Sequence, residues 1–158
     1  MDLTALILDT RSKKVKQFSL PADVEYIASE FGYDREDVVF SIQSIEELPD
    51  LNCERLTLEL ANELAENVED VDEDLVLSFI ESESSDSKYL AGVEFDDCSL
   101  YSDVATDREL GEYLVEEVGV ELSKEKLLLY IDYEKFGRDV RLKEGGSFVD
   151  KGYFVSRW

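Results

Sequence analysis

The stretch LTALILDTRSKKVKQFSLPADVEYIASEFG, residues 3–32, decides the fold of the first part of the chain. Residues 3–9 are predicted as a strand that returns, through a polar and basic turn, as a second strand over residues 15–20. Pro21 is expected at the first position of a helix, where its missing N–H leaves no hydrogen bond unmade. Four apolar residues between positions 24 and 31 recur at helical spacing, and the glycine that follows is expected to end the helix.

The next part of the chain continues with a strand and two helices. The apolar residues Val38, Phe40 and Ile42 alternate with Val39, Ser41 and Gln43, which is the period of a half-buried strand. Asn52 is expected to cap a helix that runs to about Val68, and Asp72 is expected to cap the helix after it.

The last third is predicted to contain two helices and several short strands. Residues 106–109 have the spacing of a capping box, which predicts a helix that ends at Gly119. Ser123 is expected to cap the last helix, which runs to about Phe136 and is closed by Gly137. The predicted strands cover residues 89–95, 140–142, 148–149 and 153–155, and residues 81–87 are predicted as a loop.

Length and composition favour a folded protein and exclude several classes. The 158 residues are 44% hydrophobic and 11% aromatic, whereas acidic disordered chains are poor in such residues. Histidine is absent, which removes the Ser–His and Cys–His nucleophile pairs and the commonest zinc ligand. Cys53 and Cys98 are expected to be reduced thiols, and neither a signal peptide nor a membrane span is predicted.

Charge is distributed very unevenly along the chain. The net charge is −23, yet residues 17–123 contain 31 acidic and only four basic residues, while both flanking segments are slightly basic. Duplex DNA carries one negative charge per ~1.7 Å of its axis, so 27 charges correspond to about 46 Å of duplex. This comparison suggests the hypothesis that acidic side chains replace phosphates. One alternative is a solvated acidic surface that only confers solubility. Another is the acidic coat of a halophilic protein, but such a coat would also cover the two ends, which here are slightly basic.

The candidate mimic surface consists of acids that the predicted helices and loops place outside. On the second helix Glu59, Glu63 and Glu66 recur at three- and four-residue spacing without interleaved lysine, although like charges at that spacing destabilise a helix. The full set is Asp23, Glu25, Glu30, Asp34, Glu36, Asp37, Glu46, Glu47, Asp50, Glu59, Glu63, Glu66, Glu69, Asp70, Asp72, Glu73, Asp74, Glu81, Glu83, Asp86, Asp96, Asp97, Asp103, Glu112, Glu116 and Glu117.

Two other interpretations of the acidic residues are weaker. Residues 70–81 place acids at several ligand positions of a calcium-binding EF-hand loop, but Leu75 stands where that loop requires glycine. Adjacent pairs such as Asp96–Asp97 resemble catalytic or metal-binding carboxylates, but such pairs arise freely in a chain with 39 acidic residues. We therefore predict no catalytic residue, no metal site and no cofactor.

The C-terminal part contains a motif that resembles a known family. Residues 127–139, LLLYIDYEKFGRD, are similar to the motif of the ArdA-type antirestriction proteins, in which an aliphatic run precedes Tyr-Ile-Asp-Tyr-Glu and a small residue precedes Arg-Asp. Residues 18–25 with 45–49, and residues 95–97 with 113–119, resemble two further parts of that family.

The resemblance implies an elongated, highly acidic α+β protein with two to three small lobes, each with short helices packed on a few antiparallel strands. We expect an N-terminal α+β lobe over residues 1–50, a helical middle lobe over residues 51–87 and a C-terminal α+β lobe over residues 88–158. The resemblance also implies a homodimer that forms near the motif, whose expected residues are Leu127, Leu128, Tyr130, Ile131, Asp132, Tyr133, Phe136, Arg138 and Asp139.

The implied function is inhibition without catalysis. Proteins of this family imitate bent B-form DNA, occupy the DNA groove of type I restriction–modification enzymes and are carried by mobile genetic elements. The expected partners are such an enzyme and a second copy of this chain, without nucleic acid or membrane, in the cytoplasm of a bacterial host. The alternative is an acidic interaction module that inhibits another DNA-binding or defence protein, such as a nucleoid protein or a CRISPR-type effector.

Overall fold

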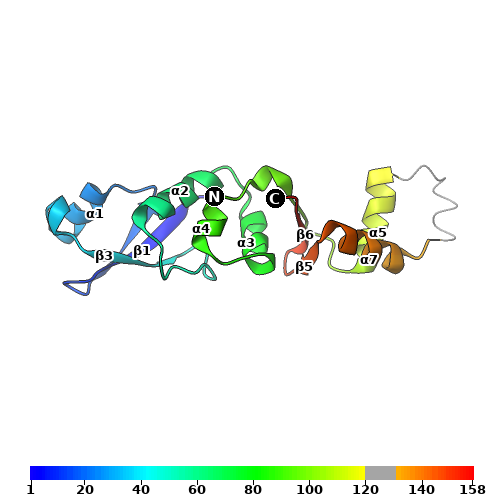
Figure 1. Cartoon of the computed structure of the whole chain (residues 1–158), viewed down its shortest axis with the longest axis horizontal. Helices are drawn as coiled ribbons and strands as arrows, with labels where there is room; N and C mark the ends of the chain where they lie inside the picture. Colours follow the sequence, from blue (N-terminus) through cyan, green and yellow to red (C-terminus); the bar gives the residue numbers. More distant parts are fainter. Residues whose placement is uncertain (120–130) are drawn as a thin grey trace. The chain divides into compact units, whose positions relative to one another are not determined.

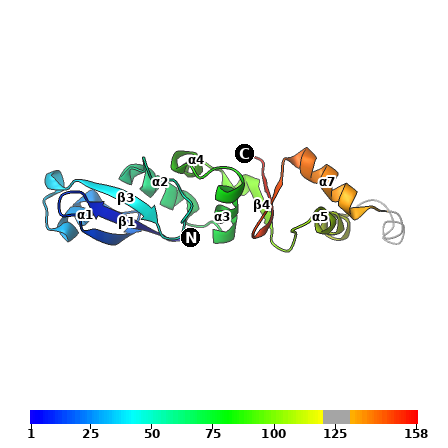
Figure 2. The same ribbon diagram turned by 90° about the horizontal axis from the view of Figure 1, so that it is seen from below.

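The computed structural model describes residues 1–119 and 131–158, apart from the side chains of Glu36 and Val118. The chain forms two compact units, unit 1 over Met1–Val93 and unit 2 over Glu94–Trp158 (Figures 1 and 2). The described part contains six α-helices and two three-stranded antiparallel sheets, which confirms the predicted α+β class. The predicted division at residues 50 and 87 stays a prediction. No described helix has both the length and the apolar composition that crossing a membrane requires.

Unit 1 begins with a sheet of three strands in the order β2-β1-β3. They are β1 (Leu3–Asp9), β2 (Val15–Leu20) and β3 (Phe40–Ile45). Every second residue of β1 is buried, because alternate side chains of a strand point to opposite faces. Helix α1 (Val24–Phe31) contributes Ile27 and Ala28 to the core. The predicted hairpin and helix are therefore confirmed.

The connection between β2 and α1 differs from the prediction that Pro21 is the first helical residue. Helix α1 begins at Val24, with Asp23 at the N-cap position. The amide of Asn62 fixes the connection, since it accepts from the N–H of Ala22 at 2.9 Å and donates to the carbonyl of Ala22 at 3.0 Å. The proline therefore belongs to a connection that is bound to the next helix, and the one-turn helix η1 (Arg35–Asp37) precedes β3.

Three helices complete unit 1. They are α2 (Leu58–Val68), α3 (Glu73–Ser82) and α4 (Ser87–Ala91). Asp72 caps α3 as predicted, but Thr57 and not Asn52 caps α2, with its hydroxyl accepting from the N–H of Leu60 at 3.2 Å. The backbone N–H of Asn52 instead donates to the carbonyl of Ser85 at 2.8 Å.

The predicted strand over residues 89–95 is wrong. The carboxylate of Asp86 accepts from the N–H groups of Lys88 and Tyr89, at 2.9 and 3.1 Å, and so starts α4 where a loop was expected. The one-turn helix η2 (Phe95–Asp97) follows in unit 2. The sequence prediction did not take this capping carboxylate into account, and it decides the local structure.

Unit 2 contains a second sheet and two helices that cross. Its strands β4 (Cys98–Tyr101), β6 (Gly152–Ser156) and β5 (Ser147–Val149) lie in that order. Helix α5 (Asp107–Tyr113) continues into the π-helical turn η3 (Leu114–Gly119), and α7 (Tyr133–Glu144) packs against α5 (Figure 2). The core includes the fully buried side chains of Leu110 and Tyr153.

The capping box that starts α5 is confirmed. The hydroxyl of Thr106 accepts from the N–H of Glu109 at 3.2 Å, and the carboxylate of Glu109 accepts from the N–H of Ala105 at 2.8 Å. These two bonds satisfy N–H groups that a helix N-terminus leaves without a partner inside the helix. The bond from the N–H of Ala105, and after it a bond from the Thr106 side chain, also lower the pKa of Glu109, because hydrogen bonds to the carboxylate stabilise its ionised form.

The last helix was predicted in the wrong register. Helix α7 begins at Tyr133, where Asp132 caps the N–H of Lys135 at 2.9 Å, and it runs to Glu144. Gly137 lies inside the helix, so it does not end it, and the predicted strand over residues 140–142 is helical. The predicted cap, Ser123, lies outside the described residues.

The close approach of α5 and α7 explains Gly137. A Cβ at this position would lie 1.7 Å from the backbone oxygen of Asp107, and a Cβ at Gly111 would lie 2.2 Å from the backbone oxygen of Tyr133. Contacts below 3.0 Å are not compatible with a side chain there. The two glycines therefore let the backbones of the two helices touch.

Candidate functional site

The candidate functional site is a set of carboxylates on the outside of the two units. Of the 26 predicted acids, 22 are exposed. A partner protein can therefore reach these side chains on the surface of each unit. The exceptions are Glu47, Asp74 and Glu112, which are partly buried, and Glu36, whose side chain lies outside the described part. Asp74 and Glu81 also interact with other residues of the chain.

One face of α2 carries the clearest acidic row. Glu59, Glu63 and Glu66, which we call the α2 acidic face, are all exposed. The opposite face of this helix is buried in unit 1 through Ala61, Leu64, Ala65 and Val68. The three carboxylates form no hydrogen bond or ion pair with another described side chain. Their mutual repulsion costs the helix a few tenths of a kcal/mol per pair, so stability of the helix does not explain them.

Some predicted acids instead have a local structural role. Asp72 and Asp86 cap α3 and α4, and the carboxylate of Glu47 accepts from the N–H of Thr4 at 2.7 Å. Such charge-assisted bonds hold loops and helix termini in place. Substituting these residues would therefore change the fold as well as the surface charge.

Three further acids form ion pairs with the chain's own cations. The distances are 2.6 Å for Glu25–Arg35, 3.3 Å for Glu30–Lys16 and 2.9 Å for Glu112–Arg108. These pairs are largely exposed to solvent, so each contributes about 1 kcal/mol or less. Glu46 also accepts a short hydrogen bond from Gln17. The α2 acidic face differs from these acids because its charge is not compensated locally.

An acid outside the predicted set has a structural role in unit 2. The guanidinium of Arg141 donates to the carboxylate of Asp107 at 3.0 Å, and both side chains are partly buried. The same guanidinium lies 5.5 Å from the ring centre of Phe148. This contact links the first turn of α5 to α7 and β5, and nothing in the sequence spacing indicated it.

The C-terminal motif lies at the start of α7 and is only partly described. Leu127, Leu128 and Tyr130 lie outside the described residues, so their predicted place in an interface stays a prediction. Ile131, Tyr133 and Phe136 are half-buried, and Asp132 is the N-cap. Arg138 and Asp139 are both exposed on α7 and do not form an ion pair with each other.

The exposed side of α7 combines charge with one apolar residue. Lys135, Arg138 and Leu142, which we call the α7 outer stripe, follow one another at helical spacing, and the side chain of Leu142 is 66% exposed. A single exposed leucine is ordinary on a protein surface. A partner protein can therefore reach the α7 outer stripe on the surface of unit 2, but the stripe does not by itself identify that partner.

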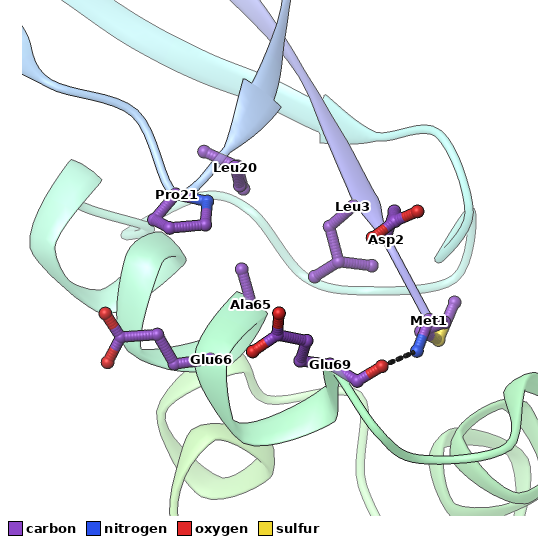
Figure 3. Close-up of a pocket in the computed structure, with 8 residues that line it drawn as sticks. All are labelled: Met1, Asp2, Leu3, Leu20, Pro21, Ala65, Glu66 and Glu69. Carbon is purple, nitrogen blue, oxygen red and sulfur yellow. Dashed lines mark hydrogen bonds between the residues drawn. The ribbon is translucent and has the colours of Figure 1, made fainter.

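A pocket of about 380 Å³ lies beside the C-terminal end of α2 (Figure 3). Its lining includes Met1, Leu20, Pro21, Glu66 and Glu69. The ammonium group at Met1 donates to the carbonyls of Val68 and Glu69 at 2.7 and 2.6 Å, and to that of Val71 at 3.1 Å. A cation is favourable here, because carbonyls at a helix C-terminus have no partner inside the helix and carry partial negative charge. The contact stabilises α2.

The described side chains do not assemble a metal site of clustered ligands. Among them, no three His, Cys, Asp or Glu side chains lie close enough together to hold a metal ion. Cys98 is buried, and burial raises the pKa of the Cys53 thiol, which keeps it protonated and poorly nucleophilic. What the surface offers chemically is a display of negative charge.

One carboxylate is fully buried and was not predicted to matter. Asp9, at the end of β1, accepts from the N–H groups of Arg11 and Ser12 at 3.0 and 3.2 Å, and from the Ser12 hydroxyl. The Tyr33 hydroxyl also bonds to it. These hydrogen bonds lower the pKa of Asp9 from 3.8 to about 2, and the bond from the Ser12 hydroxyl has the largest effect. Burial of the carboxylate opposes this shift. The same interaction raises the pKa of Tyr33.

The lowered pKa predicts how the stability of unit 1 responds to acid. Ionised Asp9 stabilises the fold fully above about pH 4, and this stabilisation is lost as the pH falls towards 2. We expect Asp9→Asn to lower the free energy of unfolding at pH 6, and the difference from the unsubstituted chain to shrink below pH 4. Urea unfolding of both chains across this range measures it. If the difference in free energy of unfolding between the two chains did not change with pH, ionised Asp9 would not be the source of the stabilisation.

Comparison with protein families gives a match over most of the chain. The profile of the family described as "Antirestriction protein (ArdA)" matches residues 14–155. That range includes β2, the α2 acidic face and the whole of the C-terminal motif. The comparison with curated individual proteins finds no match.

Proposed function

The chain belongs to the ArdA antirestriction family, and from that premise we propose that it inhibits type I restriction–modification enzymes by mimicking B-form DNA. The acidic surface would occupy the groove in which the enzyme otherwise binds duplex DNA. The action is stoichiometric binding, and the chain is not proposed to catalyse a reaction. The observation that carries the proposal is the uncompensated α2 acidic face.

Electrostatics supports this mode of action. A DNA-binding groove is lined with lysine and arginine that pair with phosphates, and releasing the counterions of such charges makes binding depend strongly on salt. Residues 17–123 have a net charge of −27 and can attract such a groove over a long distance. Among the described side chains, ion pairs bind few of these charges, so most remain available for lysine and arginine of the enzyme.

We further propose that the protein acts as a homodimer. The resemblance of residues 127–139 to the family motif supports this, and the α7 outer stripe supplies an accessible surface that includes two residues of that motif. A dimer would place two acidic surfaces in one particle and lengthen the DNA that is imitated. Because its target acts on DNA inside bacteria, we propose the bacterial cytoplasm as its place of action and a mobile genetic element as its carrier.

The proposal is tested by competition with DNA. A purified type I methyltransferase core holds a labelled cognate duplex, and the protein is added in increasing amounts. The proposal expects the duplex to be released while the protein itself binds no DNA. If instead the enzyme keeps its DNA and a nucleoid protein or another basic protein captures the chain, the acidic-module interpretation is correct.

A further inference from the structure

The side chain of Asn62, on helix α2, makes a two-point contact with the backbone of another segment of unit 1. Its amide oxygen accepts from the N–H of Ala22 at 2.9 Å, and its amide nitrogen donates to the carbonyl of the same residue at 3.0 Å. Ala22 is buried, where backbone groups need a partner inside the protein because water does not reach them. The contact therefore ties the connection between β2 and α1 to α2.

Asn62 lies next to the α2 acidic face. It follows Glu59 by three residues and precedes Glu66 by four, and residues at these spacings are neighbours on the surface of a helix. Asparagine is a poor helix former, because its side chain competes for the hydrogen bonds of the backbone. Helix propensity therefore does not explain Asn62, whereas the contact with Ala22 does.

The residue that follows the contact, Asp23, has a carboxylate that the fold of unit 1 does not use. Asp23 is the N-cap of α1, where an aspartate side chain usually accepts from an N–H of the first turn, but its side chain makes no such bond. The side chain is exposed and forms no ion pair with another described side chain. Because the carbonyl of Ala22 belongs to the peptide bond that leads into Asp23, the contact with Asn62 also fixes the backbone position of Asp23.

The contact brings together carboxylates from two segments that are far apart in the sequence. Ala22 and Asn62 are 40 residues apart. Pro21, which precedes Ala22, lines the same pocket as Glu66, so the connection runs alongside α2 (Figure 3). Asp23 therefore extends the α2 acidic face, and we call Asp23 together with that face the four-carboxylate patch. Phosphates of DNA are held at fixed spacing by a covalent backbone, and charges that are already in place lose less conformational entropy when they bind.

We propose that Asn62 is a positioning residue for inhibition, which holds Asp23 beside the α2 acidic face so that the four-carboxylate patch binds the basic groove of the enzyme as one preorganised set. This inference rests on the proposed function. Asn62 itself carries no charge, so it acts through Asp23. Satisfying the backbone of Ala22 stabilises unit 1 as well, and the test therefore has to separate positioning from stability.

A double-substitution cycle in the DNA-competition assay at low salt tests the proposal. Asp23→Lys sets a cation against the basic groove and should weaken binding about tenfold in the otherwise unsubstituted chain. In the background of Asn62→Ala, Asp23 is no longer tied to α2, and the same charge reversal should weaken binding about threefold or less.

The matched control is Asn67→Ala on the same helix. The amide of Asn67 also bonds to backbone carbonyls, but to those of Leu90 and Val93, at 3.4 and 3.0 Å. Its loss removes a comparable contact of α2 without releasing Asp23. In this background, Asp23→Lys should still weaken binding about tenfold.

Circular dichroism and urea midpoints first establish that each variant folds. If Asn62→Ala does not fold, Asn62→Asp replaces it in the cycle, because it keeps the bond from the N–H of Ala22 but sets a carboxylate against the carbonyl of that residue.

The outcomes separate the positioning role from the proposed function. If Asp23→Lys weakens binding equally with and without Asn62, this asparagine only stabilises the fold. If Asn67→Ala reduces the effect of Asp23→Lys as much as Asn62→Ala does, general loosening of α2 explains the result. If Asp23→Lys does not weaken binding by the unsubstituted chain, Asp23 makes no contact. Each of these results overturns the positioning role alone, whereas an unsubstituted chain that does not release DNA overturns the proposed function and this inference with it.

Discussion

Replacing Gly137 by alanine should destabilise unit 2 by about 3 kcal/mol or more, near the upper end of what overpacking costs. The added Cβ would lie 1.7 Å from the backbone oxygen of Asp107 and 3.0 Å from the backbone nitrogen of Gly111. Backbone atoms cannot rotate away as a flexible side chain can, so α5 and α7 must separate. This loss exceeds the roughly 1 kcal/mol that alanine gains over glycine inside a helix.

The measurement is urea unfolding, followed through the fluorescence of Trp158 and through circular dichroism. Trp158 is the chain's single tryptophan and lies in unit 2, so its signal reports on that unit. Gly111→Ala should act in the same direction, because its Cβ would lie 2.2 Å from the backbone oxygen of Tyr133. Lys135→Ala, at an exposed site of α7, is the matched control and should change stability by about 0.5 kcal/mol or less. If Gly137→Ala were no more destabilising than this control, the helix crossing would be wrong.

The same contact gives a physical reason for the small residue of the C-terminal motif. Gly137 stands before Arg138 and Asp139, which both face solvent. The crossing with α5 holds the α7 backbone that carries these two side chains. A variant at Gly137 is therefore expected to disturb this surface through the fold, and it cannot be read as a contact residue.

Neutralising the α2 acidic face should leave the protein about as stable and make it a poorer inhibitor. In the variant Glu59→Gln, Glu63→Gln, Glu66→Gln, the repulsion between neighbouring carboxylates disappears, which stabilises α2 by a few tenths of a kcal/mol per pair. Loss of the Glu59 charge from the first turn of the helix offsets this gain by a similar amount. The same change removes three charges that the proposed groove would bind. We expect affinity to fall about tenfold at low salt, and about two- to threefold for each single substitution.

The separation of binding from stability makes this a discriminating experiment. Loss of folding cannot explain weaker binding by a chain that urea unfolding shows to be as stable as the unsubstituted one. The difference from the unsubstituted chain should also disappear at high salt, where a short Debye length screens exposed charges. If one of the three single substitutions abolished inhibition, a distributed mimic would be excluded. If the triple variant bound equally well at low salt, the α2 acidic face would have no part in binding.

Short sequence patterns predicted much of the fold correctly where a residue type has one dominant effect on the local backbone, as glycine has after a helix and Asp or Thr has at an N-cap. The hairpin of β1 and β2, helix α1 with Gly32 after it, and the caps at Asp72 and Thr106 all follow from short-range chemistry. The acidic character of the surface follows from composition, since carboxylates are rarely buried without partners. The family was also identified correctly from residues 127–139.

The sequence predictions were wrong where a contact with a residue far away in the sequence determines the structural role of a residue. Gly137 has the sequence signature of a helix end, but its small size serves the crossing with α5. Asp86 looked like part of an acidic loop, yet it caps α4. The charge pattern also could not distinguish Glu47, which binds the backbone of Thr4, from the α2 acidic face, whose carboxylates have no partner among the described side chains. Such distinctions depend on partners far away in the sequence.

The most direct measurement is the release of a labelled cognate duplex from a type I methyltransferase core, titrated with this protein at two salt concentrations. DNA mimicry predicts release at about 50 mM salt and an apparent affinity at least about a hundredfold weaker at about 200 mM, as for proteins that bind several phosphates. Release that does not depend on salt, or no release by the folded protein at either concentration, would contradict the account.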